Sequence, residues 1–453
     1  MRARSLLIAA ALLLGVGVGP TAGASQAECA AVTPAGTAAQ RAQAAKVRVK
    51  YFGAQHVDER TGAVDCTRMY VAWINNSSLA ASLNGHVVLF DAFFPTHHPG
   101  YIPTDAWEMG DLLPEYLFIG HGHYDHAQEA PRVLNRSRRT VLVGTPEHCE
   151  QIRTALQGKF TPKCVAPVKK GAALGSRGTL DGLIRGVKIS VVTVPHSAAD
   201  TPDPANPKGP YGPTPFVPAY RSRLAHPPAP IGTPDRQIND GVRPGDGAEG
   251  GDILYQFRLG SFSFVYHDTS GPVRVGDATW TSLRALPPTD VEYAAVVAFD
   301  TATVGFRDSR IITEALRTRE FSPLHHDDWN EALGSEAWSY EDPVRAEFAK
   351  IPAERRPRID WLFDPSDYLA GGVRSWNPAA KTWKNDFKEP ARSEFEAAED
   401  DNFLARYAMS RLQLKGVWSC ATLAAGQADA YSAVATLQNL QALAAAQEAH
   451  HSK

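Results

Sequence analysis

The sequence has little that would place the protein within a membrane or on a nucleic acid. Beyond residue 24, no run of residues is apolar enough to span a bilayer. The formal net charge is −3 over 453 residues, so the chain has no basic excess of the kind that binds phosphate backbones. No repeat of solenoid period occurs. With 43% hydrophobic residues, we expect a globular protein that has no nucleic-acid partner and no stable membrane span.

Cysteine is scarce, and its spacing argues against a thiolate metal site. The chain has five cysteines and no Cys-x-x-Cys pair, which zinc sites built on cysteine usually contain. Cys149 and Cys164 lie close in sequence and flank a helix-like stretch, so we predict that they form a disulfide, which persists in exported proteins. Cys29, Cys66 and Cys420 remain unassigned, since one of them must stay unpaired or pair between chains.

The first 24 residues are arranged like an export signal. Arg2 and Arg4 precede the apolar run 6–18, and the small residues 22–24 resemble a cleavage site. A membrane anchor is the alternative, but the run is short for a spanning helix. We expect cleavage near Ala24. The mature chain, which loses two arginines and no acid, then carries a net charge of about −5 and is secreted or periplasmic.

The densest cluster of potential metal ligands is the segment His121-Gly122-His123-Tyr124-Asp125-His126. It follows the apolar run 116–120, which we predict to be a strand, so its side chains lie at a sheet edge where they can converge on cations. His121 and His123 are two residues apart and can point at one metal, whereas Asp125 and His126 can reach a second. Imidazole suits zinc, iron or manganese, and a carboxylate tolerates harder ions. A histidine-rich surface loop is the alternative interpretation.

This segment resembles the signature of the metallo-β-lactamase superfamily, His-x-His-x-Asp-His after a strand. The family pattern also needs an isolated His, a bridging Asp and a final His, each at a strand end. Three apolar runs supply them in the right order: 191–195 ends at His196, 262–267 at Asp268 and 321–324 at His325. The resemblance spans roughly residues 47 to 330, and the ordered set of seven ligands is more specific than the first motif alone.

The resemblance implies two divalent metal ions, zinc first, with manganese or iron(II) as options. One ion would be held by His121, His123 and His196. The other would be held by Asp125, His126 and His325. Asp268 would bridge the two ions.

Two positions depart from the family pattern. His267 stands before the bridging Asp, where the family usually has glycine, and we expect it to be a packing or supporting residue. The last ligand lies in the pair His325-His326. The family form, Pro-x-His followed by an aromatic residue, favours His325 as the ligand and puts His326 in the aromatic position.

The fold implied by the resemblance is an α/β four-layer αβ/βα sandwich, with helices on both outer faces of a β-sandwich. We assign residues 46–390 to this domain, after an Ala-rich and weakly ordered leader at 25–45. Alternation at Val47, Val49 and Tyr51 predicts a first strand.

Further local signals follow along the chain. Strands are predicted at 70–74, 86–90 and 140–143, with a turn at Asn84-Gly85, and a helix at 127–134. Asp91 ends the strand 86–90. We expect it to be a turn carboxylate, with orientation of a ligand imidazole as the alternative.

Two segments fall outside a minimal core. The insertion 197–247 is rich in proline, with eleven prolines between residues 202 and 234, so it is neither a helix nor a central strand. It is either a lid whose Tyr211 and Phe216 face the site, or a surface loop or dimer contact. The C-terminal extension 391–453 has apolar residues at helical spacing and is expected to pack on the core or in a homodimer.

The activity implied by the resemblance is hydrolysis by metal-bound hydroxide, with Asp125 holding the nucleophile in line as the catalytic residue. The motifs look most like the branch of ascorbate-6-phosphate lactonases and N-acyl phosphatidylethanolamine phospholipase D. The substrate would be a small or lipid-like ester, lactone, amide or phosphodiester. A silent metal-binding or scaffold protein is the alternative. Asp91 and Asp327 are candidates to orient the imidazoles. Candidate substrate contacts are Tyr124, His326, Trp329, Tyr211 and Phe216.

Overall fold

The structure is a computed structural model that describes residues 31–93, 106–196, 250–297, 305–327, 337–363 and 367–380. The expected signal peptide 1–24, the insertion 197–247 and the extension 391–453 lie outside these residues. In the part of the chain that is described, no helix is both long and apolar enough to cross a membrane.

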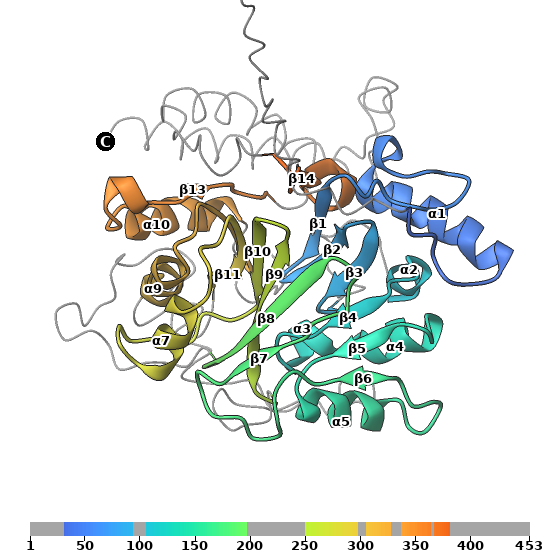
Figure 1. The fold of residues 1–453 in the computed structure, drawn as a ribbon, viewed down its shortest axis with the longest axis horizontal. Coiled ribbons are helices and arrows are strands. Elements are labelled where there is room, and N and C mark those ends of the chain that lie inside the picture. The colour runs from blue at the N-terminus through green and yellow to red at the C-terminus, as the bar shows by residue number, and fades with distance from the viewer. Residues whose placement is uncertain are drawn as a thin grey trace, which may run out of the picture.

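The first of two seven-stranded sheets is built mainly from the N-terminal half of the chain (Figure 1). Its strands are β1 (Met69–Asn75), β2 (Ser78–Leu83), β3 (His86–Phe90), β4 (Tyr116–Phe118), β5 (Val141–Val143), β6 (Cys164–Val165) and β14 (Arg374–Trp376). Their order in the sheet is β14-β1-β2-β3-β4-β5-β6. Strands β1 to β3 are antiparallel, and β3 to β6 are parallel. The residues that follow β3, β4 and β5 therefore leave at the same edge.

In the second sheet the strand order is β13-β12-β11-β10-β9-β8-β7. Its strands are β7 (Arg177–Thr179), β8 (Val187–Val194), β9 (Asp252–Leu259), β10 (Phe262–His267), β11 (Val291–Ala295), β12 (Glu320–Leu324) and β13 (Arg358–Ile359). Strands β10 to β13 run parallel, and β7 to β10 alternate in direction. The predicted ligands His196, Asp268 and His325 follow the C-terminal ends of β8, β10 and β12.

The two sheets pack face to face through aromatic side chains. Phe90 of β3 lies 5.3 Å from Phe257 of β9 and 4.6 Å from Tyr266 of β10, between ring centroids. Phe118 of β4 meets Phe257 at 5.1 Å, nearly edge-on. All four rings are fully buried, and tilted or edge-on contacts of this kind stabilise a pair beyond its burial by about 0.5–1.5 kcal/mol. This core fixes the sheets against each other beneath the edge where the candidate ligands lie.

Helices cover both outer faces of this sandwich (Figure 1). On one side lie α1 (Ala38–Phe52), α2 (Ala106–Asp111), α4 (Ala130–Arg136) and α5 (Pro146–Ala155). On the other side lie α7 (Ala278–Arg284), α9 (Arg307–Leu316) and α10 (Trp338–Phe348). One apolar cluster joins the second sheet to α10, and a separate cluster joins it to α7 and α9. The predicted α/β sandwich with helices on its outer faces is confirmed.

The first predicted strand is wrong. Residues 47–51 form the C-terminal half of α1, which starts after Thr37 in a capping box with Gln40. Buried residues recur along α1 at Ala44, Val47, Tyr51 and Phe52, a spacing of three and four that suits a helix and overrides the short alternation. The expected boundary between leader and domain at 45/46 therefore falls inside this helix.

Most other local predictions on described residues are confirmed. Strands occupy 69–75, 86–90 and 141–143, and the Asn84-Gly85 turn is present. The turn joins β3 to β2, a strand that the sequence analysis did not identify. The helix expected at 127–134 is split into α3 (Tyr124–Ala127) and α4, so the ligand motif has its own short turn of helix.

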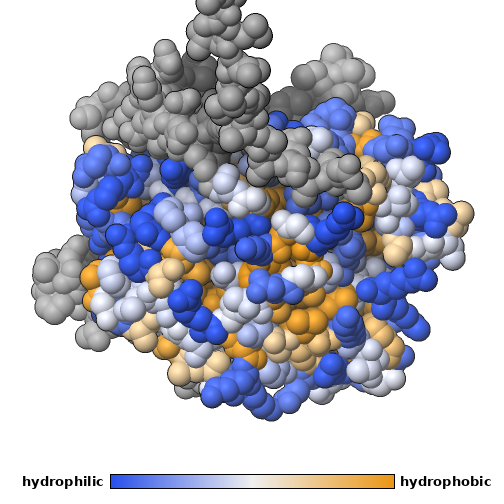
Figure 2. Space-filling view, in the orientation of Figure 1, coloured by the Kyte–Doolittle hydropathy of each residue, from blue (hydrophilic) through white to orange (hydrophobic). Residues whose placement is uncertain are grey.

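Large apolar side chains are mostly covered. Among the described residues, the exposed large hydrophobics are Leu174 and Val275. Figure 2 shows hydrophilic residues spread over the face, with hydrophobic residues showing between them.

Candidate metal centre

The ligand motif begins at a glycine that has no room for a side chain. Gly120 follows β4, donates its N–H to Asp91 Oδ1 at 3.0 Å and accepts from Ile253 N–H at 2.9 Å. A Cβ at this position would lie 2.2 Å from the carboxylate of Asp268, a distance at which the site would have to rearrange. The glycine therefore lets the chain entering His121 pass directly against Asp268.

Three histidines converge in a first triad. His121, His123 and His196 place one ring nitrogen each within 4.8 Å of one another. His121 Nε2 lies 3.1 Å from His123 Nδ1 and 3.2 Å from His196 Nε2. All three are at least nine-tenths buried. His196 reaches this point from the end of β8, so the triad joins the first sheet to the second.

A carboxylate and two histidines converge in a second triad. Asp125, His126 and His325 again place ligand atoms within 4.8 Å of one another. Asp125 Oδ2 lies 3.4 Å from His126 Nε2 and 3.2 Å from His325 Nε2. His325 follows β12 and has a left-handed backbone, with φ of 62°, which is uncommon for histidine. The two triads have the same membership as the two ligand sets implied by the family resemblance.

Asp268 contacts one histidine of each triad. Its Oδ2 lies 2.8 Å from His121 Nδ1 and 3.3 Å from His126 Nδ1, and these three residues form a third group of potential ligands. Its Oδ1 is buried and accepts no hydrogen bond from the described residues. The carboxylate therefore lies between the triads, with one oxygen on the imidazole edges and the other available to a cation.

The protonation states of two histidines in the first triad favour metal binding. Burial lowers the pKa of His121 and of His123 to about 3, against the raising effect of the Asp268 and Asp125 carboxylates. Both imidazoles are therefore neutral near pH 7, and a neutral ring offers a lone pair to a metal.

The second triad, in contrast, contains charged groups. Burial opposes charge on His126, but the Asp125 and Asp268 carboxylates outweigh it and raise the pKa of His126 well above its usual value. Burial likewise opposes ionisation of Asp125, yet His126 and His325 hold its pKa well below its usual value. A cation bound here would replace the proton as the partner of Asp125.

Asp91 orients the second triad, and the expectation of a plain turn carboxylate is wrong. Its Oδ2 lies 2.7 Å from His126 Nδ1, while its Oδ1 accepts from Gly120 N–H. Burial and then the neighbouring Asp268 raise the pKa of Asp91 to about 8. Bonding at Nδ1 directs the Nε2 of His126 towards Asp125 and His325, as a carboxylate behind a metal-binding imidazole does.

The predicted substrate contacts divide into three groups. Tyr124 is a half-buried residue within the motif, with its ring 6.0 Å from that of Phe93. His326 is fully buried, stacks on Trp73 at 5.2 Å and bonds the Leu362 carbonyl through Nε2 at 2.8 Å. This is the environment of a packing residue and does not support substrate contact by His326. The remaining three, Trp329, Tyr211 and Phe216, lie outside the described residues.

Of three residues beside the triads, two were not predicted from the sequence and one was predicted to have another role. Asp252 starts β9, and its Oδ1 lies 3.7 Å from His121 Nδ1. Asn76 bonds the main chain of Asp125 through Nδ2 at 2.7 Å. Asp327, expected to orient an imidazole, instead accepts from the Asn76 N–H at 2.9 Å. Only long-range pairing of the sheets reveals these contacts, because no local motif surrounds the residues.

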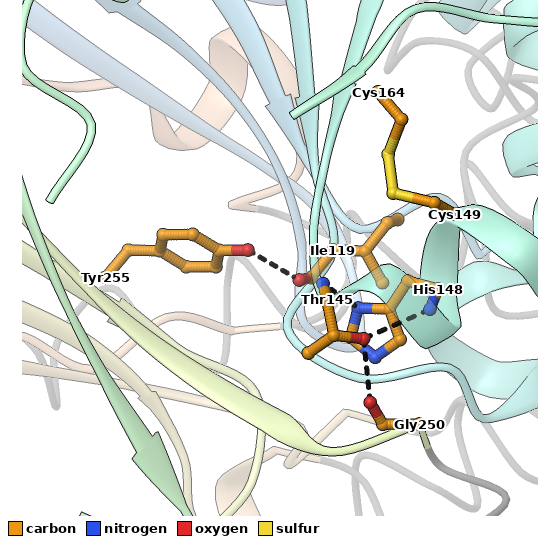
Figure 3. The surroundings of a disulfide bond; sticks show 7 residues. All are labelled: Ile119, Thr145, His148, Cys149, Cys164, Gly250 and Tyr255. Atoms are coloured by element: carbon orange, nitrogen blue, oxygen red, sulfur yellow. Dashed lines mark hydrogen bonds between the residues drawn. A yellow bond between two sulfur atoms is a disulfide. The ribbon is translucent and has the colours of Figure 1, made fainter. Parts of the chain in front are cut away.

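The predicted disulfide between Cys149 and Cys164 is confirmed, with a Cα–Cα distance of 6.1 Å (Figure 3). It ties α5 to β6. The start of the same helix is capped by Thr145, whose hydroxyl accepts from His148 N–H and donates to the Gly250 carbonyl at 2.7 Å. Gly250 lies two residues before Asp252, so α5 braces the chain that enters β9 beside the first triad.

A second contact supports the start of the ligand motif, and a second disulfide involves another part of the chain. Tyr255 of β9 donates its hydroxyl to the Ile119 carbonyl at 2.9 Å, just before the ligand motif (Figure 3). Cys66 is also disulfide-bonded. Its partner lies outside the described residues, which leaves Cys29 and Cys420 as the choices that the sequence offers.

The donor sets fit metal ions. Each triad offers three nitrogen or oxygen ligands from buried, oriented side chains, and such sets leave a position open for water or substrate. Three imidazoles suit zinc or iron, and the carboxylate of the second triad also suits manganese. Asp268 can add a ligand oxygen to either triad.

The comparisons with known proteins are distant. No protein-family profile and no curated protein matches the chain. Among solved structures, Igni18, a metallo hydrolase from the archaeon Ignicoccus hospitalis, is 13% identical with a TM-score of 0.41, over 68% of this chain and 98% of that one. YhfI, a metallo-β-lactamase fold protein from Bacillus subtilis, is 11% identical with a TM-score of 0.40, over 68% and 100%. CmlA, a diiron β-hydroxylase from Streptomyces venezuelae, is 14% identical with a TM-score of 0.38, over 68% and 54%. Similarities this distant transfer no metal, activity or substrate.

Proposed function

We propose that this protein is a binuclear metal-dependent hydrolase of the metallo-β-lactamase superfamily. The observation that supports the proposal is the pair of buried triads, His121/His123/His196 and Asp125/His126/His325, with Asp268 in contact with both. The seven candidate ligands come from separate segments of the chain. Polar side chains that bind nothing are not expected to gather in this way inside a core.

The chain's own residues would divide the work as follows. The first triad would bind through three imidazoles, and the second through two imidazoles and the Asp125 carboxylate. When bound, the ions would lower the pKa of a coordinated water towards about 7 and polarise a carbonyl or phosphoryl oxygen of the substrate. Asp91 orients His126 through its Nδ1, and Asp268 balances the charge between the triads. Asp125 would both hold a metal and orient the attacking oxygen.

The substrate class follows from this chemistry and from the expected export of the chain. Metal-assisted attack suits an ester, lactone, amide or phosphodiester bond. We propose a small or lipid-like substrate outside the cytoplasm, in line with the resemblance to the lactonase and N-acyl phosphatidylethanolamine phospholipase D branch. The N-terminal signal motif supports secreted or periplasmic localisation, and mass spectrometry of the exported protein would find its start near Ser25 if cleavage occurs as expected.

The decisive experiment measures metal content and turnover on the same sample. Protein purified from the export compartment is expected to carry about two metal ions per chain and to hydrolyse at least one substrate in a panel of lactones, phosphodiesters, phospholipids and β-lactams. His121→Ala should abolish that turnover. His86→Ala is a matched control, because His86 lies outside the triads and bonds Glu115, and it should retain turnover. One metal or none at saturation would contradict the binuclear site, and two metals without turnover of any substrate would favour a silent binding protein.

A further inference from the structure

Asn76 lies in the turn between β1 and β2 and contacts the main chain of two members of the second triad. Its Nδ2 donates to the Asp125 carbonyl at 2.7 Å, and its own carbonyl accepts from the His325 N–H at 3.1 Å. All three residues are buried. One residue of the first sheet thus ties the ligand motif after β4 to the ligand that follows β12 in the second sheet.

The residue type matches both tasks. Asn76 has a left-handed backbone, with φ of 44°, and asparagine is among the few non-glycine residues that adopt this conformation readily. Glycine would keep the backbone but lose the donor to Asp125. Aspartate would keep the shape but place an oxygen, instead of an N–H, against the Asp125 carbonyl.

The turn is itself held by the chain that follows His325. Asp327 Oδ2 accepts from the Asn76 N–H at 2.9 Å and from the Tyr368 hydroxyl. Trp73 donates its Nε1 to the Asn76 carbonyl at 2.9 Å and stacks on His326. Residues 325–327 and the β1–β2 turn therefore form one hydrogen-bonded unit, with His325 at its edge.

The first triad has a different support. Among the hydrogen bonds of the described residues, none joins Asn76 to His121, His123 or His196. That triad is braced instead by Tyr255 and by the chain entering β9. A change at Asn76 should therefore reach one triad and spare the other.

We propose that Asn76 is a positioning residue that sets the affinity of the second metal site separately from the first. The inference rests on the two-metal site proposed above. Asn76 acts through the main chain of Asp125 and His325, so it fixes the separation of the two ligands without binding the metal. Removing a group that orients metal ligands typically costs about 10–100-fold in affinity.

The test uses Asn76→Gly on two single-site backgrounds, with Zn²⁺ as the probe. His196→Ala weakens the first triad, so a Zn²⁺ titration reports the second site. His325→Ala weakens the second, so the titration reports the first. Adding Asn76→Gly should raise the Zn²⁺ dissociation constant by about 10-fold or more on the His196→Ala background and leave it unchanged on the His325→Ala background. Equal effects on both backgrounds, or none on either, would overturn the proposal.

Controls separate positioning from general loss of structure. Asn84→Gly is the matched variant, because Asn84 also has a left-handed backbone in a turn of the same sheet, with φ of 52°, and it should change neither constant. Tyr368→Phe removes the hydroxyl on Asp327 and should weaken the second site in the same direction, by less. It carries the test if the Asn76 variant does not fold, and unchanged affinity in Tyr368→Phe would then count against the proposal. If the unmutated protein binds fewer than two Zn²⁺, the proposed binuclear site has failed. If it binds two and Asn76→Gly is not selective, this inference alone has failed.

Discussion

The two triads of ligands differ in their chemistry and in the parts of the fold that hold them. The first is three buried imidazoles, of which burial keeps His121 and His123 neutral; its neighbours are β9 and the start of α5, through Tyr255 and Gly250. The second contains a carboxylate paired with histidines, and it is held by Asp91 and by the turn at Asn76. The two triads thus depend on different supports, so each should be open to weakening without the other.

The difference also bears on metal choice. An all-imidazole set favours zinc or iron, whereas a set with a carboxylate accepts manganese as well. The second triad also contains the charged groups. Burial opposes ionisation of Asp125, and His126 and His325 keep its carboxyl ionised. Asp268 contacts a histidine of each triad.

The largest effect is expected for Asp268→Ala. The carboxylate contacts His121 of the first triad and His126 of the second, so its loss should weaken both sites by more than ~100-fold, or about 2.8 kcal/mol each, and abolish turnover. Zn²⁺ titration together with a steady-state assay measures this, and circular dichroism should still show a folded chain. Loss of one site alone would show that Asp268 belongs to a single triad.

Asp91→Ala should come next and should act on the second triad. The variant removes the acceptor on His126 Nδ1 and on Gly120 N–H, so the ring loses its fixed direction. We expect about a 10–100-fold weaker second site and a smaller change at the first, measured on the His196→Ala and His325→Ala backgrounds. Asp65→Ala, which removes a carboxylate before β1, is the control. A stronger effect at the first triad would show that Asp91 supports mainly that triad.

The ligand candidates came from one local motif together with the family resemblance, whereas the residues that support them could not be predicted. His121, His196 and His325 each follow an apolar run, and a strand that ends in a polar residue can be recognised without knowing what lies beside it. Asp91 also follows such a strand, but its contact with His126 depends on the register of β3 against β4. From the sequence it looked like a turn residue, because pairing of two strands cannot be seen in either one.

The fold shows the same limit. The aromatic and β-branched runs that became β3, β10 and β12 were predictable, and so was their place in a sandwich once the family resemblance was recognised. The alternation at 47–51 fitted a short strand as well as one face of α1. The helix forms because residues from Ala44 to Phe52 bury one continuous stripe. Asn76 and Asp252 had no local signal, since their partners lie in other segments of the chain.

A smaller effect is expected for Asp252→Asn, this time on the first triad. Asp252 Oδ1 lies 3.7 Å from His121 Nδ1, beyond direct hydrogen-bond range, whereas Asp268 lies at 2.8 Å. Its charge should therefore add to a contact that Asp268 already makes, and its loss should weaken the first site by less than about tenfold. The measurement is Zn²⁺ affinity on the His325→Ala background. An effect as large as that of Asp268→Ala would show that Asp252 is the main partner of His121.

The smallest effect on the metals is expected for the double variant Cys149→Ser, Cys164→Ser. The disulfide closes a loop with a sequence separation of 15, and the loss of such a crosslink costs about 3 kcal/mol of unfolding free energy. The folded site should change little, because Thr145 still caps α5 and still bonds the Gly250 carbonyl. Urea unfolding should record the loss of stability. Zn²⁺ affinity should fall only slightly. That small loss should occur at the first triad, because Gly250 leads into Asp252, which lies beside His121. A larger change at the second triad would mean that α5 supports the ligand motif as a whole, and the separation of the two supports would not hold.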